Sequence, residues 1–149
     1  DYTAWLLERS MKTLSVRFFR QQKNAVELAN YLSECDMIDK IYYPGLSTHK
    51  GHDIAKDQMD GFGAVISFEL NKKIDPKKFL KSLEMINPSM SFAGVESTML
   101  SPAETSHYLL TPEDRLAQGI TDNLIRFSVG IEDVPDVIYD FEQALNKCN

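Results

Sequence analysis

The chain has 149 residues and a formal net charge of −6, with 43% hydrophobic and 26% charged residues, which are ordinary values for one globular domain. An acidic chain of this kind is a poor match for a nucleic-acid groove or an anionic membrane surface, because both require clustered Lys and Arg. No apolar run approaches the roughly 20 residues of a membrane helix, and residues 1–3 do not resemble the start of a signal peptide.

The first elements follow from the spacing of apolar residues. Residues 1–31 carry apolar side chains at steps of three and four, which predicts one long helix, with a bend near Ser15. Residues 37–43 are rich in Ile and Tyr and predict a short strand that ends at Pro44-Gly45. A short helix is expected over residues 52–59.

The middle of the chain combines clear and unclear signals. Residues 64–70 predict a strand, since they are rich in Val, Ile and Phe. Asp75-Pro76 predicts a helix start that places a capping side chain before proline, and that helix should run to about Leu83. Residues 84–110 show neither period and predict loops with short extended pieces. Thr111-Pro112 repeats the cap-then-proline pattern and predicts a brief helix.

Alternation returns near the C-terminal end. Residues 124–129 predict a strand with Leu124, Arg126 and Ser128 on one face and the apolar residues on the other. Asp133 is expected to cap a final helix. The elements together predict an α+β fold of two layers, with a sheet of about four largely antiparallel strands and helices on one face.

Several polar residues are candidates for chemistry. His49 and His52 lie three residues apart in a predicted loop, and a metal would need a further ligand, so we expect no metal site there. Ser106 precedes His107, but no carboxylate can be assigned to orient a nucleophile pair. The two cysteines are far apart in the sequence and fit reduced thiols of a cytosolic protein.

Arg126 is the residue that calls for an explanation. A guanidinium within an otherwise apolar strand is costly unless it has a partner. Arginine is the side chain best shaped to hold a carboxylate through two parallel hydrogen bonds. The residues alone leave two interpretations open, which are a ligand carboxylate and an internal ion pair with one of the 22 acids.

Five collinear motifs resemble those of one enzyme family. They are LLERSMKTL (residues 6–14), YYPGL (42–46), QMDGFG (58–63), SFAGVES (91–97) with a following PA and His, and GITDNLIRFSVGIED (119–133). On these motifs the chain is identified as a member of the Cys/Met-metabolism family of pyridoxal-phosphate enzymes, which includes cystathionine synthases and lyases, methionine γ-lyase and homoserine-ester sulfhydrylases.

The resemblance implies a fold and a domain assignment. The chain would be the small C-terminal domain of the aspartate-aminotransferase-like fold, spanning residues 1–149. Residues 1–33 would form a long helix leading in from a large domain that holds pyridoxal 5'-phosphate. The family also implies a cytoplasmic homo-oligomer, a dimer or tetramer.

The resemblance also implies roles for individual residues. Arg126 would bind the substrate α-carboxylate, with help from the backbone around Phe92. Ser91 would be the catalytic residue of this chain, close to the cofactor and the substrate. The cofactor-binding lysine belongs to a motif that has no match here, so we expect the isolated chain to be inactive.

The choice among the family's reactions depends on one position. Met90 stands where synthases and γ-lyases of the family often carry glutamate, which favours a cystathionine β-lyase-like enzyme among the C–S lyases and transferases. Phe92, Ala93 and Ser101 also depart from the family pattern. The alternative is a stand-alone α+β module that binds a carboxylate or assists assembly and performs no catalysis.

Overall fold

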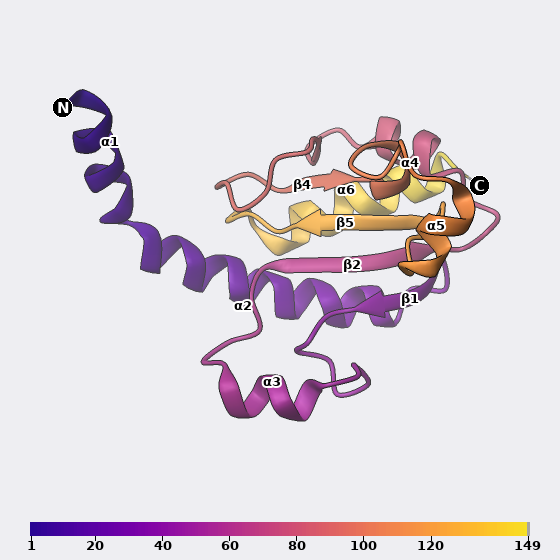
Figure 1. Cartoon of the computed structure of the whole chain (residues 1–149), viewed down its shortest axis with the longest axis horizontal. Helices are drawn as coiled ribbons and strands as arrows, with labels where there is room; N and C mark the ends of the chain where they lie inside the picture. Colours follow the sequence, from indigo (N-terminus) through magenta and orange to yellow (C-terminus); the bar gives the residue numbers. More distant parts are fainter. Residues whose placement is uncertain (149) are drawn as a thin grey trace.

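The computed structural model describes residues 1–148 and is built on one five-stranded sheet (Figure 1). The strand order is β1-β2-β5-β4-β3, and all neighbours are antiparallel except β3 and β4. The strands are β1 (Ile38–Tyr42), β2 (Val65–Leu70), β3 (Asn87–Pro88), β4 (Thr98–Leu100) and β5 (Leu124–Ser128). The predicted α+β class and largely antiparallel pairing are confirmed. The sheet has five strands where about four were predicted, and β3 and β4 both lie in residues 84–110, for which the sequence predicted only short extended pieces.

The long helices lie on one face of the sheet. In Figure 1, α2, α4 and α6 lie behind the strands, which leaves the front of the sheet open over most of its width. The helices are α1 (Tyr2–Met11), α2 (Leu14–Ser33), α3 (His52–Gln58), α4 (Pro76–Ser82), the 3-10 turn η1 (Pro102–Glu104), α5 (Pro112–Ala117) and α6 (Val134–Asn146). Helices on one face were predicted, and this arrangement is confirmed.

The core fills the space between the sheet and these helices. Alternate residues of the central strands, such as Phe68 and Phe127, are buried on this face. The ring of Phe141 on α6 packs edge-on against Phe68 and Phe79, with centroids 5.6 and 5.2 Å apart. Each such side chain contributes about 1.5–3 kcal/mol when fully buried, so these aromatic residues fix α6 and α4 against the strands.

Two of the three predicted helix caps form. The Asp75 carboxylate accepts from the Lys77 N–H at 2.9 Å, and the Thr111 hydroxyl accepts from the Asp114 N–H at 3.2 Å. Asp133 precedes α6 but makes no capping hydrogen bond, and its carboxylate pairs with the Arg20 guanidinium instead. The prediction of an Asp133 cap is therefore wrong, because a cation on α2 competes for the same carboxylate.

The first predicted helix is two helices. The break lies at residues 12–13, two residues before the bend predicted near Ser15, and it separates α1 from α2. The Ser10 hydroxyl donates back to the Leu6 carbonyl at 2.8 Å, and the Arg17 guanidinium donates to the Ser10 carbonyl at 3.1 Å. Such side-chain bonds to the helix backbone are known to bend helices.

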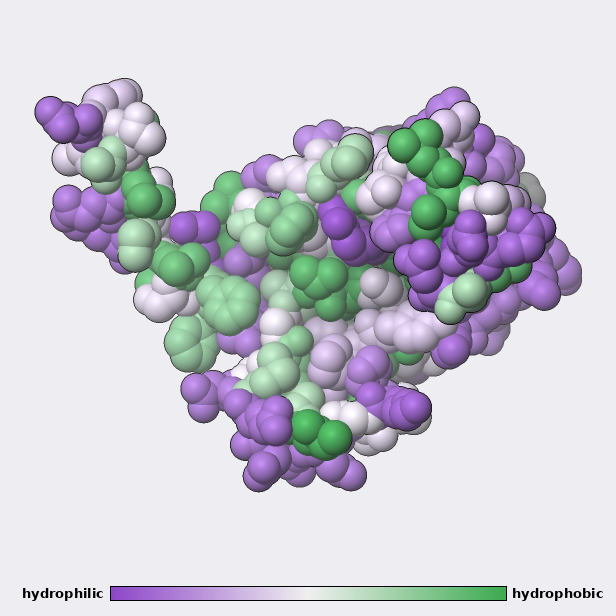
Figure 2. All heavy atoms as spheres, in the orientation of Figure 1, coloured by the Kyte–Doolittle hydropathy of each residue, from purple (hydrophilic) through white to green (hydrophobic). Residues whose placement is uncertain are grey.

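Helix α1 projects from the body of the molecule and contributes no buried residue (Figure 1). Figure 2 shows apolar side chains gathered along α1 and the start of α2. The largest exposed ones are Tyr2, Trp5, Leu7, Met11, Phe18 and Phe19. Among residues 1–148, no helix is both long and apolar enough to cross a membrane.

Both cysteines and Tyr43 pack in or against the hydrophobic core. Cys35 and Cys148 are free thiols at the edge of the core, and burial raises the pKa of Cys148. Tyr43 is fully buried, its hydroxyl donates to the Gly63 carbonyl at 3.1 Å, and burial raises its pKa to about 12. Cys148 and Tyr43 therefore remain neutral near pH 7 and act as parts of the packing.

Candidate carboxylate-binding site

Arg126 is the central residue of β5, and its side chain lies on the open face of the sheet. Its neighbours Ile125 and Phe127 are buried in the core on the opposite face. Because side chains alternate along a strand, Arg126 leaves the sheet on the other side. It pairs in register with Ser67 of β2 and Leu100 of β4. The alternation predicted for this strand is confirmed.

The Arg126 guanidinium is oriented by neutral groups. Its Nη2 atom donates to the carbonyls of Met90 at 2.9 Å and Ser91 at 3.3 Å. Its Cζ atom lies 5.1 Å from the centroid of the Phe92 ring, a cation–π distance. The Nε atom is buried and has no hydrogen-bond partner among residues 1–148. The three residues before Ala93 therefore fix the plane of the guanidinium.

No acid neutralises Arg126 within residues 1–148, since none of the six ion pairs there includes it. Glu69 is the acid of β2 on the same face, two residues from Ser67, but it accepts a hydrogen bond of 2.5 Å from the Tyr42 hydroxyl. Burial, followed by this bond to Glu69, raises the pKa of Tyr42. The internal ion pair that the sequence left open is not found among residues 1–148.

The segment that carries Ser91 and Phe92 is tied to the sheet. The Ser91 carbonyl accepts from the Thr98 hydroxyl at 2.9 Å, and the Ala93 N–H donates to the Ser128 hydroxyl at 3.0 Å. Ala93 has a φ of 62°, a left-handed conformation that costs a non-glycine residue about 1–2 kcal/mol. The Ser91 side chain is exposed and its hydroxyl has no partner within residues 1–148. Ser91 and Phe92 are therefore exposed side chains on a backbone that hydrogen bonds hold in place.

Two buried amides of α2 hold the backbone behind this segment. Gln21 donates to the carbonyls of Gly94 at 2.6 Å and Val129 at 3.1 Å. Asn24 donates to the Gly130 carbonyl at 3.1 Å. Neither residue was predicted from the sequence to have a role in the site. Their spacing of three, on the face that α2 turns to the core, was the available signal, because a polar residue on such a face needs a partner.

A carboxylate completes this buried network. Glu132 accepts from the Ser97 N–H at 2.6 Å and from the Ser97 hydroxyl at 2.9 Å. The Gly130 N–H donates to the same hydroxyl at 2.9 Å. A side chain at Gly130 would meet the Ser97 nitrogen and the Val95 oxygen at 2.5 Å. Only glycine allows the end of β5 to approach the turn that follows Phe92.

The other candidate residues from the sequence make no hydrogen bond or ion pair to Arg126 within residues 1–148. The Ser106 hydroxyl is 2.8 Å from Nδ1 of His107, but both are surface groups, and no acid bonds to this histidine within the described chain. His52 contacts the Pro44 carbonyl at 2.7 Å through Nδ1 and stacks on Phe62. No cluster of three or more His, Cys, Asp or Glu suited to a metal ion occurs in residues 1–148.

A mixed sheet with helices on one face, and an arginine without an acid partner in residues 1–148 on the other, defines an α+β domain with a candidate anion site. A sequence model described as "Cys/Met metabolism PLP-dependent enzyme" matches residues 1–146, so the chain belongs to this family. The family assignment made from the motifs is confirmed.

Individual relatives agree with this assignment. An L-methionine gamma-lyase of Fusobacterium nucleatum subsp. polymorphum is 44% identical over 97% of this chain and 37% of its own length. A cystathionine beta-lyase of Lactococcus lactis subsp. cremoris (strain MG1363) is 42% identical over 97% of this chain and 38% of its own. The crystal structure of cystathionine gamma-lyase from Lactobacillus plantarum, complexed with L-serine, is 40% identical and superposes with a TM-score of 0.93. That match covers 97% of this chain and 38% of the solved chain. The chain thus spans less than two fifths of each relative.

Proposed function

We propose that this chain is the C-terminal, substrate-binding part of a pyridoxal-phosphate enzyme that forms or breaks C–S bonds in sulfur amino acids. Its task is to hold the α-carboxylate of the substrate through Arg126. The observation that carries the proposal is the guanidinium on the open sheet face, which is oriented by two carbonyls and an aromatic ring and has no acid partner in residues 1–148.

The donor set fits a carboxylate. With Nη2 directed to the Met90 and Ser91 carbonyls, Nη1 has no acceptor within residues 1–148. The Phe92 N–H has none within the described residues either, and the Phe92 ring lies 5.1 Å from the guanidinium carbon. Each charge-assisted hydrogen bond to a carboxylate contributes about 1.5–3 kcal/mol. Two such bonds fix both the position and the plane of the substrate's carboxylate end.

Ser91 is the residue of this chain that we assign nearest to the reacting atoms. Its hydroxyl is exposed and without a partner in the described residues, next to a carbonyl that Arg126 contacts. A free hydroxyl there can donate to or accept from a group beside the bound carboxylate. The fixed backbone on both sides of Ser91 supports a role in orienting the substrate.

Pyridoxal phosphate, when bound, supplies the electron sink for the reaction. The residues described here fit the substrate carboxylate beside the cofactor. We assign the groups that hold the cofactor itself to the portion of the enzyme outside this chain, since the relatives are more than twice as long. The open sheet face would contact that portion. The exposed apolar side chains of α1 support association with it or with further subunits, in a cytoplasmic homotetramer.

Met90 bears on the choice of substrate. Its side chain is 62% exposed and its carbonyl contacts Arg126, so it borders the proposed site. A thioether offers no counter-charge to a distal ammonium group, which favours β-elimination from cystathionine in the manner of a cystathionine β-lyase. A similarity of 42% to one such enzyme is compatible with this choice, and similar values hold for γ-lyases and a γ-synthase.

The carboxylate assignment is tested by Arg126→Lys and Arg126→Ala in the full-length enzyme. Lysine retains the charge but loses the planar fork, so KM should rise about tenfold while the melting temperature stays the same. Alanine should lower kcat/KM further, also with little thermal effect, because no buried acid is left unpaired. A large loss of melting temperature with normal activity per folded molecule would show that Arg126 is a structural residue.

A further inference from the structure

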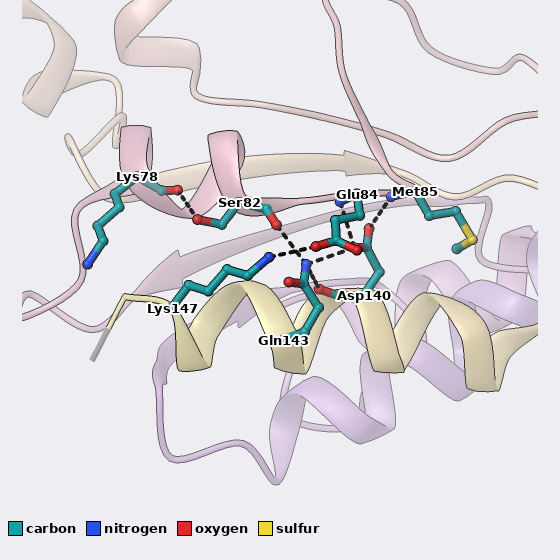
Figure 3. A network of polar contacts seen from close by, with 7 residues as sticks. All are labelled: Lys78, Ser82, Glu84, Met85, Asp140, Gln143 and Lys147. Carbon is teal, nitrogen blue, oxygen red and sulfur yellow. Dashed lines mark hydrogen bonds and ion pairs between the residues drawn. The ribbon is translucent and has the colours of Figure 1, made fainter.

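Asp140 on α6 is a buried carboxylate bound by the backbone of another segment. Its side chain accepts from three successive N–H groups. Figure 3 shows those of Glu84, at 2.7 Å, and Met85, at 3.0 Å. The third is the N–H of Ile86, at 2.8 Å. The amide of Gln143, one turn along α6, donates to Oδ1 at 3.0 Å. Asp140 is only 3% exposed, and no cation pairs with it in the described residues. Backbone donors thus take the place of a counter-ion.

The anchored segment leads directly to the Arg126 site. After Ile86, the chain forms β3 at the edge of the sheet, where the Asn87 N–H donates to the Ser97 carbonyl and the Ser89 N–H donates to the Met99 carbonyl. The carbonyls of the next two residues are the ones that accept from Arg126. Met90, whose carbonyl is the first of these, lies four positions after Ile86, a span of at most about 14 Å. The two-residue strand β3 restrains the position of Met90 and Ser91 only weakly. The backbone before β3, at residues 84–86, must therefore be held by other contacts.

We propose that Asp140 is a positioning residue for substrate binding. It fixes residues 84–86, β3 carries that position to Met90 and Ser91, and their carbonyls orient the Arg126 guanidinium. Asp140 touches neither substrate nor cofactor and acts through this backbone alone. The inference rests on the proposed role of Arg126 as the carboxylate-binding residue.

Asp140→Asn is the direct test in the full-length enzyme. The amide keeps the shape of the side chain but has one acceptor oxygen. If the new amide nitrogen takes the place of Oδ2, the N–H groups of Met85 and Ile86 lose their acceptor. If it takes the place of Oδ1, the N–H of Glu84 loses its acceptor. With L-cystathionine as substrate we expect KM to rise about tenfold while kcat changes less than twofold, because the carboxylate is held in a displaced geometry.

Two readouts separate positioning from general stability. A substrate analogue with a carboxamide in place of the α-carboxylate should bind equally to the wild type and to Asp140→Asn, since it lacks the group that Arg126 holds. Hydrogen exchange of residues 90–93 should accelerate in Asp140→Asn, without a matching change in α2 or β2.

Two control variants lie on the same elements. Lys147→Met removes the exposed ion pair of 2.6 Å to the Glu84 side chain and leaves the backbone anchor intact. Phe141→Leu loosens the core beside Asp140 and touches no atom of residues 84–86 in the contacts described above. Both should keep KM within twofold of the wild type, although Phe141→Leu lowers the melting temperature.

If Asp140→Asn does not fold, Gln143→Leu takes its place, because it removes one donor to Asp140 and the bond of 2.7 Å to the Ser82 carbonyl. Its KM should rise about threefold. If the variant that folds, Asp140→Asn or Gln143→Leu, has the same KM as Phe141→Leu, the inference is overturned and the role of Arg126 stands. A normal KM in Arg126→Lys would instead refute the proposed function, and the inference with it.

Discussion

Gly130 provides a quantitative test of how tightly the site is packed. A Cβ atom at this position would lie 2.5 Å from both the Ser97 nitrogen and the Val95 oxygen, about 1 Å closer than ordinary contact. Gly130→Ala must therefore displace backbone, which costs about 1–3 kcal/mol as overpacking. The same displacement breaks the 2.6 Å bond from the Ser97 N–H to Glu132, worth about 1.5–3 kcal/mol. We expect unfolding to be easier by about 4 kcal/mol.

The measurement is urea denaturation of the 149-residue chain, with Gly63→Ala as the matched control. Gly63 has a φ of 78°, but a Cβ atom added there would have no atom within 4 Å, so alanine incurs only the left-handed penalty of about 1–2 kcal/mol. The full-length Gly130→Ala enzyme should also lose carboxylate affinity. Equal losses of stability for the two variants would refute the close approach of β5 to residues 95–97.

The other predictions concern the whole enzyme and the isolated chain. The isolated chain should form no stable one-to-one yellow complex with pyridoxal phosphate in an absorbance titration, because the lysine motif has no match, and turnover of cystathionine by such a complex would contradict this. The full-length enzyme should convert cystathionine mainly to homocysteine and pyruvate, because Met90 offers no charge to a distal ammonium group. Product analysis that finds mainly cysteine and 2-oxobutanoate would count against a β-lyase. The isolated chain should self-associate in light scattering and bind a hydrophobic dye, since Trp5, Phe18 and Phe19 are 54%, 45% and 74% exposed. A monomer without dye binding would show that another part of the chain covers them.

The sequence predicted those elements whose signals are local. Asp75-Pro76 and Thr111-Pro112 each place a capping side chain before proline, and both helices begin there with the expected cap bond. The strand around Arg126 alternates because its core residues and its open-face residues meet different surroundings. Capping and alternation act within a few residues, so a single sequence is enough to find them.

The features that the sequence did not reveal depend on partners far along the chain. β3 forms because β4 offers it an edge, and neither its length nor its composition indicates a strand. Asp133 has the right position for a cap, yet Arg20, 113 residues away, binds its carboxylate. Asp140 reads as an ordinary polar residue of an amphipathic helix, and only the approach of residues 84–86 makes it an anchor.

The charged groups of the site share one physical arrangement, in which neutral dipoles hold each charge. Carbonyls orient Arg126, backbone N–H groups hold Asp140, and an N–H with a hydroxyl holds Glu132. A dipole fixes the geometry of an ion without cancelling its charge, whereas an ion pair would cancel it. Asp140 is buried, and its carboxylate accepts hydrogen bonds from backbone N–H groups. Glu132 accepts from the N–H and the hydroxyl of Ser97. Of these three, Arg126 is the one that lies on the open face, and it has no acid partner within residues 1–148, so we propose that a ligand carboxylate neutralises its charge. The proposed carboxylate site rests on that difference in exposure.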